Sequence, residues 1–123
     1  MSNITTLGID LAKSVFQLCG LNQGRKVIFN KQVKRARLLD EVRKHPNTVI
    51  AMEACGSAHH WARTFSEMGY TVRLIPAQHV KALVRGNKND VADALAIAEA
   101  VFRPNIHDVE PKTLEQQLSL IHI

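Results

Sequence analysis

Three short apolar runs, separated by turn residues, occupy the first third of the chain. Thr5–Asp10, Ser14–Leu21 and Lys26–Val33 are rich in the β-branched, aromatic and aliphatic residues that strands favour, and the turn signal Asn22-Gln-Gly24 separates the last two. Short connections between consecutive strands favour antiparallel pairing. This part of the sequence therefore predicts a three-stranded antiparallel meander.

The rest of the chain alternates between helical and strand patterns. Thr48–Met52 and Thr71–Ile75 are near-continuous apolar runs, which are typical of strands covered on both faces. Between and after them, apolar residues recur at helical spacing. The order β-β-β-α-β-α-β-α-α predicts an α/β fold, a mixed five-stranded sheet with helices on both faces. The predicted helices are Arg35–His45, Ala58–Met68, Ala77–Val84 and Asn87–Phe102.

Four carboxylates stand at distinctive places in this pattern. Asp10 and Glu53 each close a buried strand, where a lone carboxylate is costly to desolvate. Asp90 and Asp93 lie three residues apart at the start of the last helix, and residues at that spacing share a helix face. Sites in α/β sheets form at the carboxyl ends of parallel strands. Since Mg²⁺ takes oxygen ligands and paired ions drive phosphoryl chemistry, the four acids predict a shared metal site.

The alternative interpretation of each acid is structural. A strand-end acid can cap a turn in solvent, and acids in the first turn of a helix are stabilised by its dipole by ~0.3–1 kcal/mol each. Spacing alone leaves that alternative open for Asp90 and Asp93.

The charge of the chain indicates a polyanionic partner. Its 123 residues, enough for one domain, carry 16 Lys and Arg against 11 Asp and Glu, for a net charge of +5. Without the four site acids the remainder has 16 basic and 7 acidic residues, which suits a partner held by its phosphates. A merely solvated basic surface is the alternative, and it is favoured for the looser group between Lys31 and Lys44. The candidate phosphate contacts are Lys13, Lys81, Arg85 and Lys88, of which the last three have the spacing of one helix face.

The cysteines and the hydropathy pattern indicate a cytoplasmic protein. Cys19 and Cys55 have neither CxxC spacing nor a zinc-site pattern, so both are expected to be reduced, buried thiols. The N-terminus lacks the pattern of a signal peptide, and no run approaches the ~20 apolar residues of a membrane span. No membrane partner is expected.

The pattern weakens near the C-terminus. Residues 1–104 are predicted to form the folded domain, and residues 105–123 a linker and the start of a helical connector. Thr113 has the position of an N-cap for that helix, with Gln116 at the capping-box position. Because this helix has barely begun, the sequence is expected to be one part of a longer protein.

Several short segments resemble one family. Lys88-Asn-Asp-Val-Ala-Asp-Ala94 is similar to a Lys-x-Asp-x-x-Asp-Ala signature and is the most specific, whereas Gly8-Ile-Asp10 alone also occurs in actin-like kinases. Over about residues 4–120 the chain resembles the N-terminal domain of transposases of the insertion sequence 110 type. The other matching segments are Gly8–Lys13, Met52–Gly56, Gly69-Tyr70 and Pro76–Leu83.

That resemblance implies a fold like that of RuvC and ribonuclease H, with Asp10, Glu53, Asp90 and Asp93 as the catalytic, metal-binding DEDD acids. It implies metal-dependent cleavage and transfer of DNA strands during transposition, with Mg²⁺ or Mn²⁺ as cofactor and two ions expected. DNA is the implied partner, a guide RNA encoded by the element is a further candidate, and the full-length protein is expected to be a homo-oligomer in a bacterial or archaeal cytoplasm. Family members add a second domain with a catalytic serine, so recombination by this chain alone is not expected.

Two alternatives to a transposase domain remain open. One is a junction resolvase or ribonuclease H-like nuclease that needs only water, and the other is a non-catalytic nucleic-acid-binding module whose acids are structural. An actin-like kinase is disfavoured, because the chain is half the needed size and has no second glycine-rich phosphate loop. His59 and His60 are weaker candidates for a base near Glu53, and the apolar stripe that Trp61 shares with Phe65 favours the core for that indole.

Overall fold

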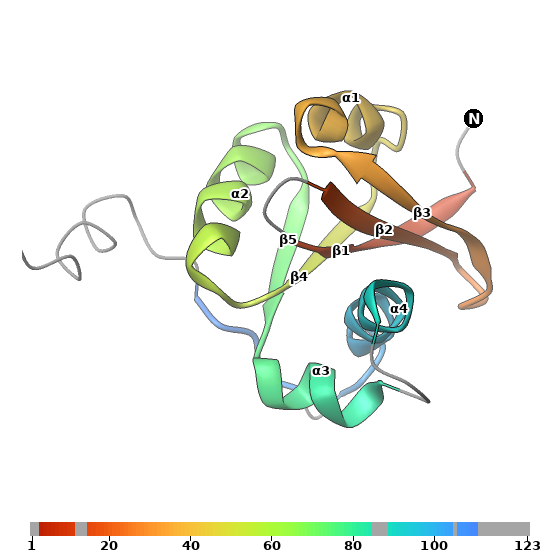
Figure 1. The fold of residues 1–123 in the computed structure, drawn as a ribbon, viewed down its shortest axis with the longest axis vertical. Coiled ribbons are helices and arrows are strands. Elements are labelled where there is room, and N and C mark those ends of the chain that lie inside the picture. Colours follow the sequence, from red (N-terminus) through yellow and green to blue (C-terminus); the bar gives the residue numbers. More distant parts are fainter. Residues whose placement is uncertain (1–2, 12–14, 85–88, 105, 111–123) are drawn as a thin grey trace, which may run out of the picture.

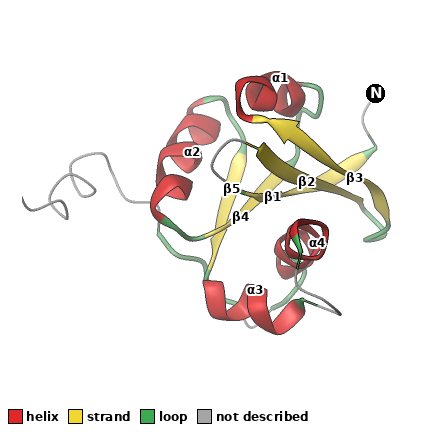
Figure 2. Cartoon of the chain, viewed as in Figure 1, coloured by secondary structure: helices red, strands yellow, loops and turns green. Residues whose placement is uncertain are grey.

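A five-stranded mixed sheet forms the centre of the molecule, and helices cover both of its faces (Figures 1 and 2). The computed structural model describes residues 3–11, 15–84, 89–104 and 106–110. Of Asp90, within the third range, it describes the backbone but not the side chain. The strand order is β3-β2-β1-β4-β5, which confirms the predicted mixed sheet. The strands are β1 (Ile4–Asp10), β2 (Val15–Asn22), β3 (Val27–Lys34), β4 (Val49–Glu53) and β5 (Thr71–Ile75).

The pairing of the strands follows from the lengths of the connections. β1, β2 and β3 form the predicted antiparallel meander, whereas β4 and β5 run parallel to β1 after helical crossovers. The helices are η1 (Arg35–Arg37), a 3-10 turn that leads into α1 (Leu38–Arg43), followed by α2 (Gly56–Glu67), α3 (Ala77–Leu83) and α4 (Asp90–Ala100). Among the residues described, no helix has the length and apolar character needed to cross a membrane.

Two predicted helix boundaries are wrong in ways that matter for the site. The helix predicted from Asn87 begins at Asp90, because Asn89 has an extended backbone and its side-chain oxygen accepts a hydrogen bond from the Ala92 amide at 2.8 Å. The helix predicted to reach Val84 ends at Leu83, since Val84 is itself extended. Each boundary is therefore set by one residue with a non-helical backbone.

The two faces of the sheet are built from different kinds of residue. On the face under α1 and α2, large side chains such as Leu7, Phe16 and Met52 are fully or almost fully buried, together with Trp61 and Phe65 of α2. On the opposite face, under α3 and α4, small residues dominate the contact. This asymmetry lets α4 lie closer to the sheet than the helices of the other face.

Gly8 is the point of closest approach between β1 and α4. A Cβ atom on Gly8 would lie 2.6 Å from the Ala94 carbonyl oxygen and 2.7 Å from the Ala98 amide nitrogen. Both of these atoms belong to the backbone, so no side-chain rotation could relieve the contact. Only glycine fits at this position of β1.

The segment after α4 returns to the sheet. Arg73 of β5 makes a bidentate ion pair with Asp108, at 2.7 Å for both bonds, and donates to the Val101 carbonyl at 2.8 Å. The Val109 amide donates to the Leu74 carbonyl at 2.8 Å. Residues 106–110, predicted as linker, therefore lie against β5.

We expect Gly8→Ala to lower the free energy of unfolding by about 1–3 kcal/mol, the usual range for overpacking a core contact. The added methyl group would force α4 away from β1. Gly56→Ala is the matched control, since a Cβ atom there would meet nothing within 4 Å, and the change should stay within about 1 kcal/mol. Urea unfolding of both variants checks this, and equal midpoints for the two would contradict the proposed contact.

Candidate active site

Asp10 and Glu53 end adjacent parallel strands and belong to the same face of the sheet. The pairing of β1 with β4 ends at Ile9 and Met52, so the two acids that follow them stand side by side. Gly8, two residues before Asp10, faces α4, and residues two apart on a strand share a face. By the same alternation Glu53 shares a face with Ala51, which is buried in the cluster formed with α4. Both acids are partly buried.

The start of α4 lies toward the strand ends that carry these acids. Phe102, just after α4, lies under the guanidinium of Arg25, 4.7 Å from its ring centre. Arg25 belongs to the turn between β2 and β3, which is at the end of the sheet where β1 begins, since Ile4 pairs with Asn22. The C-terminal end of α4 thus lies near the start of β1, and its N-terminal end lies near Asp10.

Asp93 shares a helical stripe with buried residues that face β4. Residues three and four positions later, Ala96 and Ile97, are buried in the same cluster as Ala51. One helical turn back from Ile97 is ~6 Å, and two strand residues forward from Ala51 is ~7 Å toward the same end. Because the two displacements are similar and run toward the same end, Asp93, which is partly buried, lies toward the Glu53 end of β4.

The remaining acid, Asp90, is the first residue of α4, and its side chain lies outside the described part of the structure. Within that described part, no three His, Cys, Asp or Glu side chains are grouped so as to hold a metal ion. The chemistry of the donors, carboxylate oxygens alone, still fits a hard divalent cation. Convergence of the four acids on shared ions stays a prediction.

A chain of hydrogen bonds ties the first turn of α4 to the sheet beside Asp10. Gln17 pairs with Asp10 across the strands and is only 4% exposed. Its side-chain nitrogen donates to the Asn30 side-chain oxygen at 2.6 Å, and the Asn30 side-chain nitrogen donates to the Val91 carbonyl at 3.0 Å. Val91 lies between the two acids of α4. The link therefore fixes the turn that carries them relative to β1.

The predicted phosphate contacts are only partly described. Lys81 is exposed on α3, whereas Lys13, Arg85 and Lys88 lie outside the described residues. Since α3 ends at Leu83 and Val84 is extended, α3 carries Lys81 alone of these residues, and a face shared with Arg85 and Lys88 stays a prediction.

His59, His60 and Trp61 belong to α2, which covers the face of the sheet opposite to the one shared by Asp10 and Glu53. His59 is 6% exposed within α2, whereas His60 is exposed. Trp61 is 7% exposed and packs against Phe16 and Phe65, with ring centres 5.7 Å apart in both cases, so its predicted place in the core is confirmed.

Both cysteines are free, but only one is buried as predicted. Cys19 lies under α4, and burial raises the pKa of its thiol to about 12, with a smaller contribution from Glu99. Cys55 is exposed, because it stands at the N-cap of α2 where the chain leaves the sheet. The prediction of a buried Cys55 is therefore wrong.

The sequence matches a transposase family over nearly its whole length. Residues 7–120 fit the sequence model of the IS110-type DEDD transposases, which is described as "Transposase". This chain belongs to that family. The four acids all fall within the matched region, as do β4 and the part of β1 from Leu7 to Asp10.

Relatives from several bacteria are longer than this transposase domain. The chain is 50% identical over 117 residues to the transposase for insertion sequence element IS1111A of Coxiella burnetii, covering 95% of this chain and 32% of that protein. It is 50% identical over 115 residues to a probable family 20 transposase of Pseudomonas aeruginosa, covering 94% of this chain and 34% of that protein. The domain thus spans about a third of the length of these relatives.

Solved structures share the fold of this transposase domain. RuvC of T. thermophilus, in complex with a Holliday junction substrate, superposes with a TM-score of 0.61 at 16% identity, covering 86% of this chain and 99% of that one. A second T. thermophilus RuvC structure gives a TM-score of 0.58. These matches confirm the predicted RuvC-like fold.

Gln17 and Asn30 were not predicted from the sequence to support the site. In the sequence they are polar residues within apolar runs, and an unpaired polar residue on a covered strand needs a hydrogen-bond partner. That signal could have singled out Gln17. The partner of Asn30, however, lies 61 residues away and depends on the placement of α4.

We expect Asn30→Leu to loosen the first turn of α4 in this transposase domain. The substitution removes the bond to Val91 and leaves the buried Gln17 nitrogen without its acceptor, at a cost of about 1–3 kcal/mol. Hydrogen exchange should become faster in the first turn of α4 and less so elsewhere. Tyr70→Phe is the matched control, because the Tyr70 hydroxyl donates to the Val42 carbonyl at 2.8 Å on the other face of the sheet. Unchanged exchange in α4 of Asn30→Leu would refute the role of this link.

Proposed function

We propose that this chain is the catalytic DEDD domain of an insertion-sequence transposase, and that it contributes metal-dependent cleavage and transfer of DNA strands. Asp10, Glu53, Asp90 and Asp93 are the catalytic and metal-binding acids of this proposal. The observation that carries it is the placement of Asp10 and Glu53 at adjacent ends of parallel strands, below the start of α4, in a chain of the transposase family.

Three of the four acids are held by regular elements of the fold. Asp10 and Glu53 are fixed by the register of β1 and β4, and Asp93 by the burial of Ala96 and Ile97. Mg²⁺ or Mn²⁺, with two ions expected, would supply stabilisation of the charge that develops on the attacking and leaving oxygens. Holding the acids on a sheet and a helix, rather than on loops, limits the reorganisation needed to bind such ions.

The wider partners of the longer protein are part of the same proposal. DNA is the substrate, and Lys13, Lys81, Arg85 and Lys88 are proposed to contact its phosphates. A guide RNA encoded by the element and a homo-oligomeric assembly are proposed for the full-length protein, in the cytoplasm. The domain alone is proposed to bind DNA but not to recombine it, because strand transfer needs a positioned nucleophile.

A resolvase is the second candidate, since the domain superposes on nearly the whole of a RuvC chain. That likeness concerns the fold. A resolvase would cut branched DNA rapidly without any further domain, whereas the transposase domain is expected to nick it slowly at most.

Mn²⁺ should raise the melting temperature of the domain. An ion that binds only the folded state stabilises it by about 1.4 kcal/mol at a concentration ten times its dissociation constant. Asp10→Asn should remove most of this increase. Asp40→Asn is the control, because Asp40 is an exposed acid of α1 and should leave the increase unchanged. A melting temperature indifferent to millimolar Mn²⁺ in the unaltered domain would count against a metal site.

Incubation with branched DNA and Mn²⁺ tests the proposed activity. We expect at most slow nicking by the unaltered domain and none by Asp10→Asn, since removing one acid should abolish metal-dependent cleavage. Gel analysis of end-labelled strands measures the rate and the cutting position. Fast, junction-specific cutting by the domain alone would favour the resolvase instead.

A further inference from the structure

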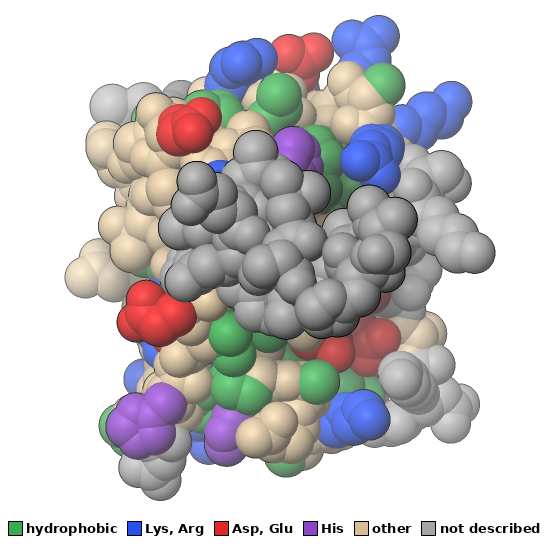
Figure 3. Space-filling view, turned by 90° about the vertical axis from the view of Figure 1, so that its left-hand side faces the viewer, with side chains coloured by type: hydrophobic (Ala, Val, Ile, Leu, Met, Phe, Trp, Pro, Cys, Tyr) green, Lys and Arg blue, Asp and Glu red, His purple; other side chains and the backbone are tan. Residues whose placement is uncertain are grey.

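The positive charge of the chain is concentrated in one short segment. Residues 25–44 contain eight Lys and Arg and two acids, for a net charge of +6. The other 103 residues contain eight Lys and Arg and nine acids, for a net charge of −1. This segment forms β3, η1 and α1, so the basic character of the chain belongs to one edge of the sheet. In the side view of Figure 3, Lys and Arg side chains gather at the top, the end at which Figure 1 shows α1.

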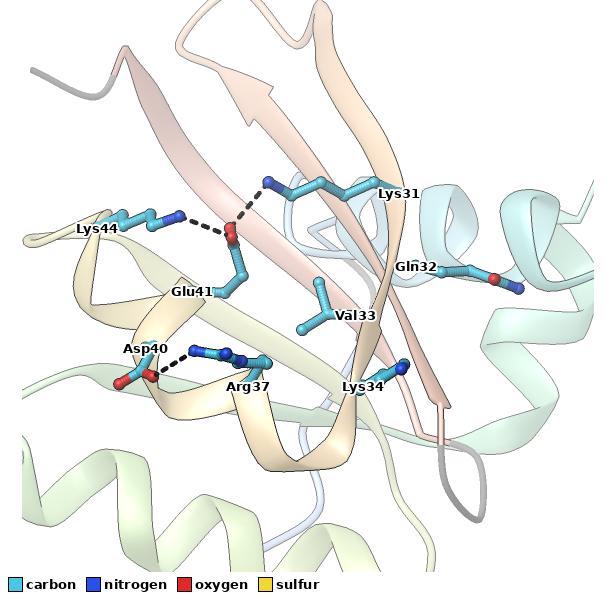
Figure 4. A pocket seen from close by; sticks show the side chains of 8 residues that line it. All are labelled: Lys31, Gln32, Val33, Lys34, Arg37, Asp40, Glu41 and Lys44. Carbon is cyan, nitrogen blue, oxygen red and sulfur yellow. Dashed lines mark hydrogen bonds and ion pairs between the residues drawn. The ribbon is translucent and has the colours of Figure 1, made fainter.

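A groove runs along this edge. It has a volume of about 540 Å³ and lies between β3 and the η1–α1 segment (Figure 4). β3 is the terminal strand of the sheet. We call the groove and its rim the β3–α1 surface. Its lining residues are Lys31, Gln32, Val33, Lys34, Arg37, Asp40, Glu41 and Lys44.

The acids of this surface hold cations in place without neutralising them. Lys31 and Lys44 both point at the Glu41 carboxylate, at 2.8 Å and 2.9 Å, and these hydrogen bonds hold the pKa of Glu41 below its usual value (Figure 4). The Glu41 side chain is only 14% exposed, whereas the two lysines are 45% and 65% exposed. One largely buried carboxylate thus orders two partly exposed ammonium groups, and the three side chains together carry a net charge of +1.

The second acid repeats this arrangement more loosely. Asp40 lies 3.9 Å from Arg37 and 3.5 Å from Arg43, and all three side chains are largely exposed. Lys34, also exposed, adds a further positive charge at the end of β3. The β3–α1 surface therefore keeps a surplus of cations on its solvent side.

The register of the sheet connects this surface to the acids of the site. Asp10 pairs with Gln17, and Gln17 pairs with Gln32 of β3. Lys34 is two residues beyond Gln32, so it belongs to the face of the sheet that Asp10 shares. Lys31 and Val33 belong to the opposite face, under α1, so the β3–α1 surface extends around the edge strand and reaches the face of the acids through Lys34. Two strand spacings of ~4.8 Å and two residues along the strand separate Asp10 from Lys34 by roughly 12 Å. Along the axis of duplex DNA, that span corresponds to the rise of about three or four nucleotides of one strand.

We propose that the β3–α1 surface binds the backbone of duplex DNA next to the segment that lies at the Asp10–Glu53 site. This inference rests on the proposed function, because the DNA is the substrate of that site. Lys34, held roughly 12 Å from Asp10, would fix where the strand enters, and the cations of the groove would hold the duplex farther along the edge. Arg37 can pair with a phosphate through two parallel hydrogen bonds, whereas the lysines act as point charges. The surface is distinct from α3, the helix that carries Lys81, because α1 and α3 lie on opposite faces of the sheet (Figure 1).

Binding of a mixed-sequence DNA duplex, measured in EDTA over a range of salt concentrations, tests the proposal. The double variant Lys34→Gln/Arg37→Gln should lower the slope of log affinity against log salt by about 2, since each lost phosphate contact contributes ~0.9. Its affinity at about 0.1 M salt should fall by tenfold or more, as the same relation implies. Lys26→Gln/Arg103→Gln is the matched control with the same loss of charge, because both residues are exposed at the far end of the sheet. It should retain the affinity within about twofold, since general steering by net charge is a weaker effect than lost contacts.

Equal losses of affinity in the two double variants would overturn the proposal, and so would the absence of binding by the unaltered domain. Competition by polyglutamate as effective as that by DNA would reassign the surface to an acidic protein, and tighter binding of an RNA hairpin would reassign it to RNA. Since EDTA removes metal, this test is independent of the Mn²⁺ experiment: a missing Mn²⁺ effect would count against the catalytic proposal alone.

Discussion

The close contact between Gly8 and α4 is the constraint on which the site depends. Two backbones meet there with no side chain between them, so the distance from β1 to α4 is set by the chain itself. Because Ala94 and Ala98 offer a smooth apolar surface, that contact alone would allow α4 to slide along its axis. The Gln17–Asn30–Val91 link supplies the missing restraint through directional bonds. The steric contact thus sets the distance of α4 from the sheet, and the hydrogen bonds set its position along its own axis.

The opposite charges of the molecule are separated by the sheet's own geometry. Acids occur where β1 and β4 end and where α4 begins, while cations occupy the terminal strand β3 and the helix that follows it. Two strand widths keep these groups apart, so the cations do not neutralise the acids directly. A polyanion that spans both regions would then meet attraction at one of them and the proposed catalytic acids at the other.

The sequence predicted the topology well because each strand has a distinct apolar run and each connection has a length that limits its pairing. Thr71–Ile75 was placed to the residue for this reason, with Pro76 as a clear stop. The ends of α3 and α4 were less predictable, since they depend on the backbone conformation of Val84 and Asn89. Asp10 and Glu53 could be nominated from their strand ends. Asn30 could not, because its role arises from a contact between distant segments, and the charge of β3 and α1 gained meaning only once the register placed Lys34 near Asp10.

The two edges of the sheet differ in a further respect. On the β5 side, residues 106–110 shield the edge through the Arg73–Asp108 pair and the Val109–Leu74 bond. None of the strands in the described part of the chain pairs with the outer side of β3, which exposes Val27 and Ile28, at 42% and 46%. An open strand of this kind tends to recruit strands from other molecules, and lysines along it discourage such association. Lys31 and Lys34 are therefore expected to disfavour the pairing of β3 with a strand of another molecule, while the same charges attract a polyanion.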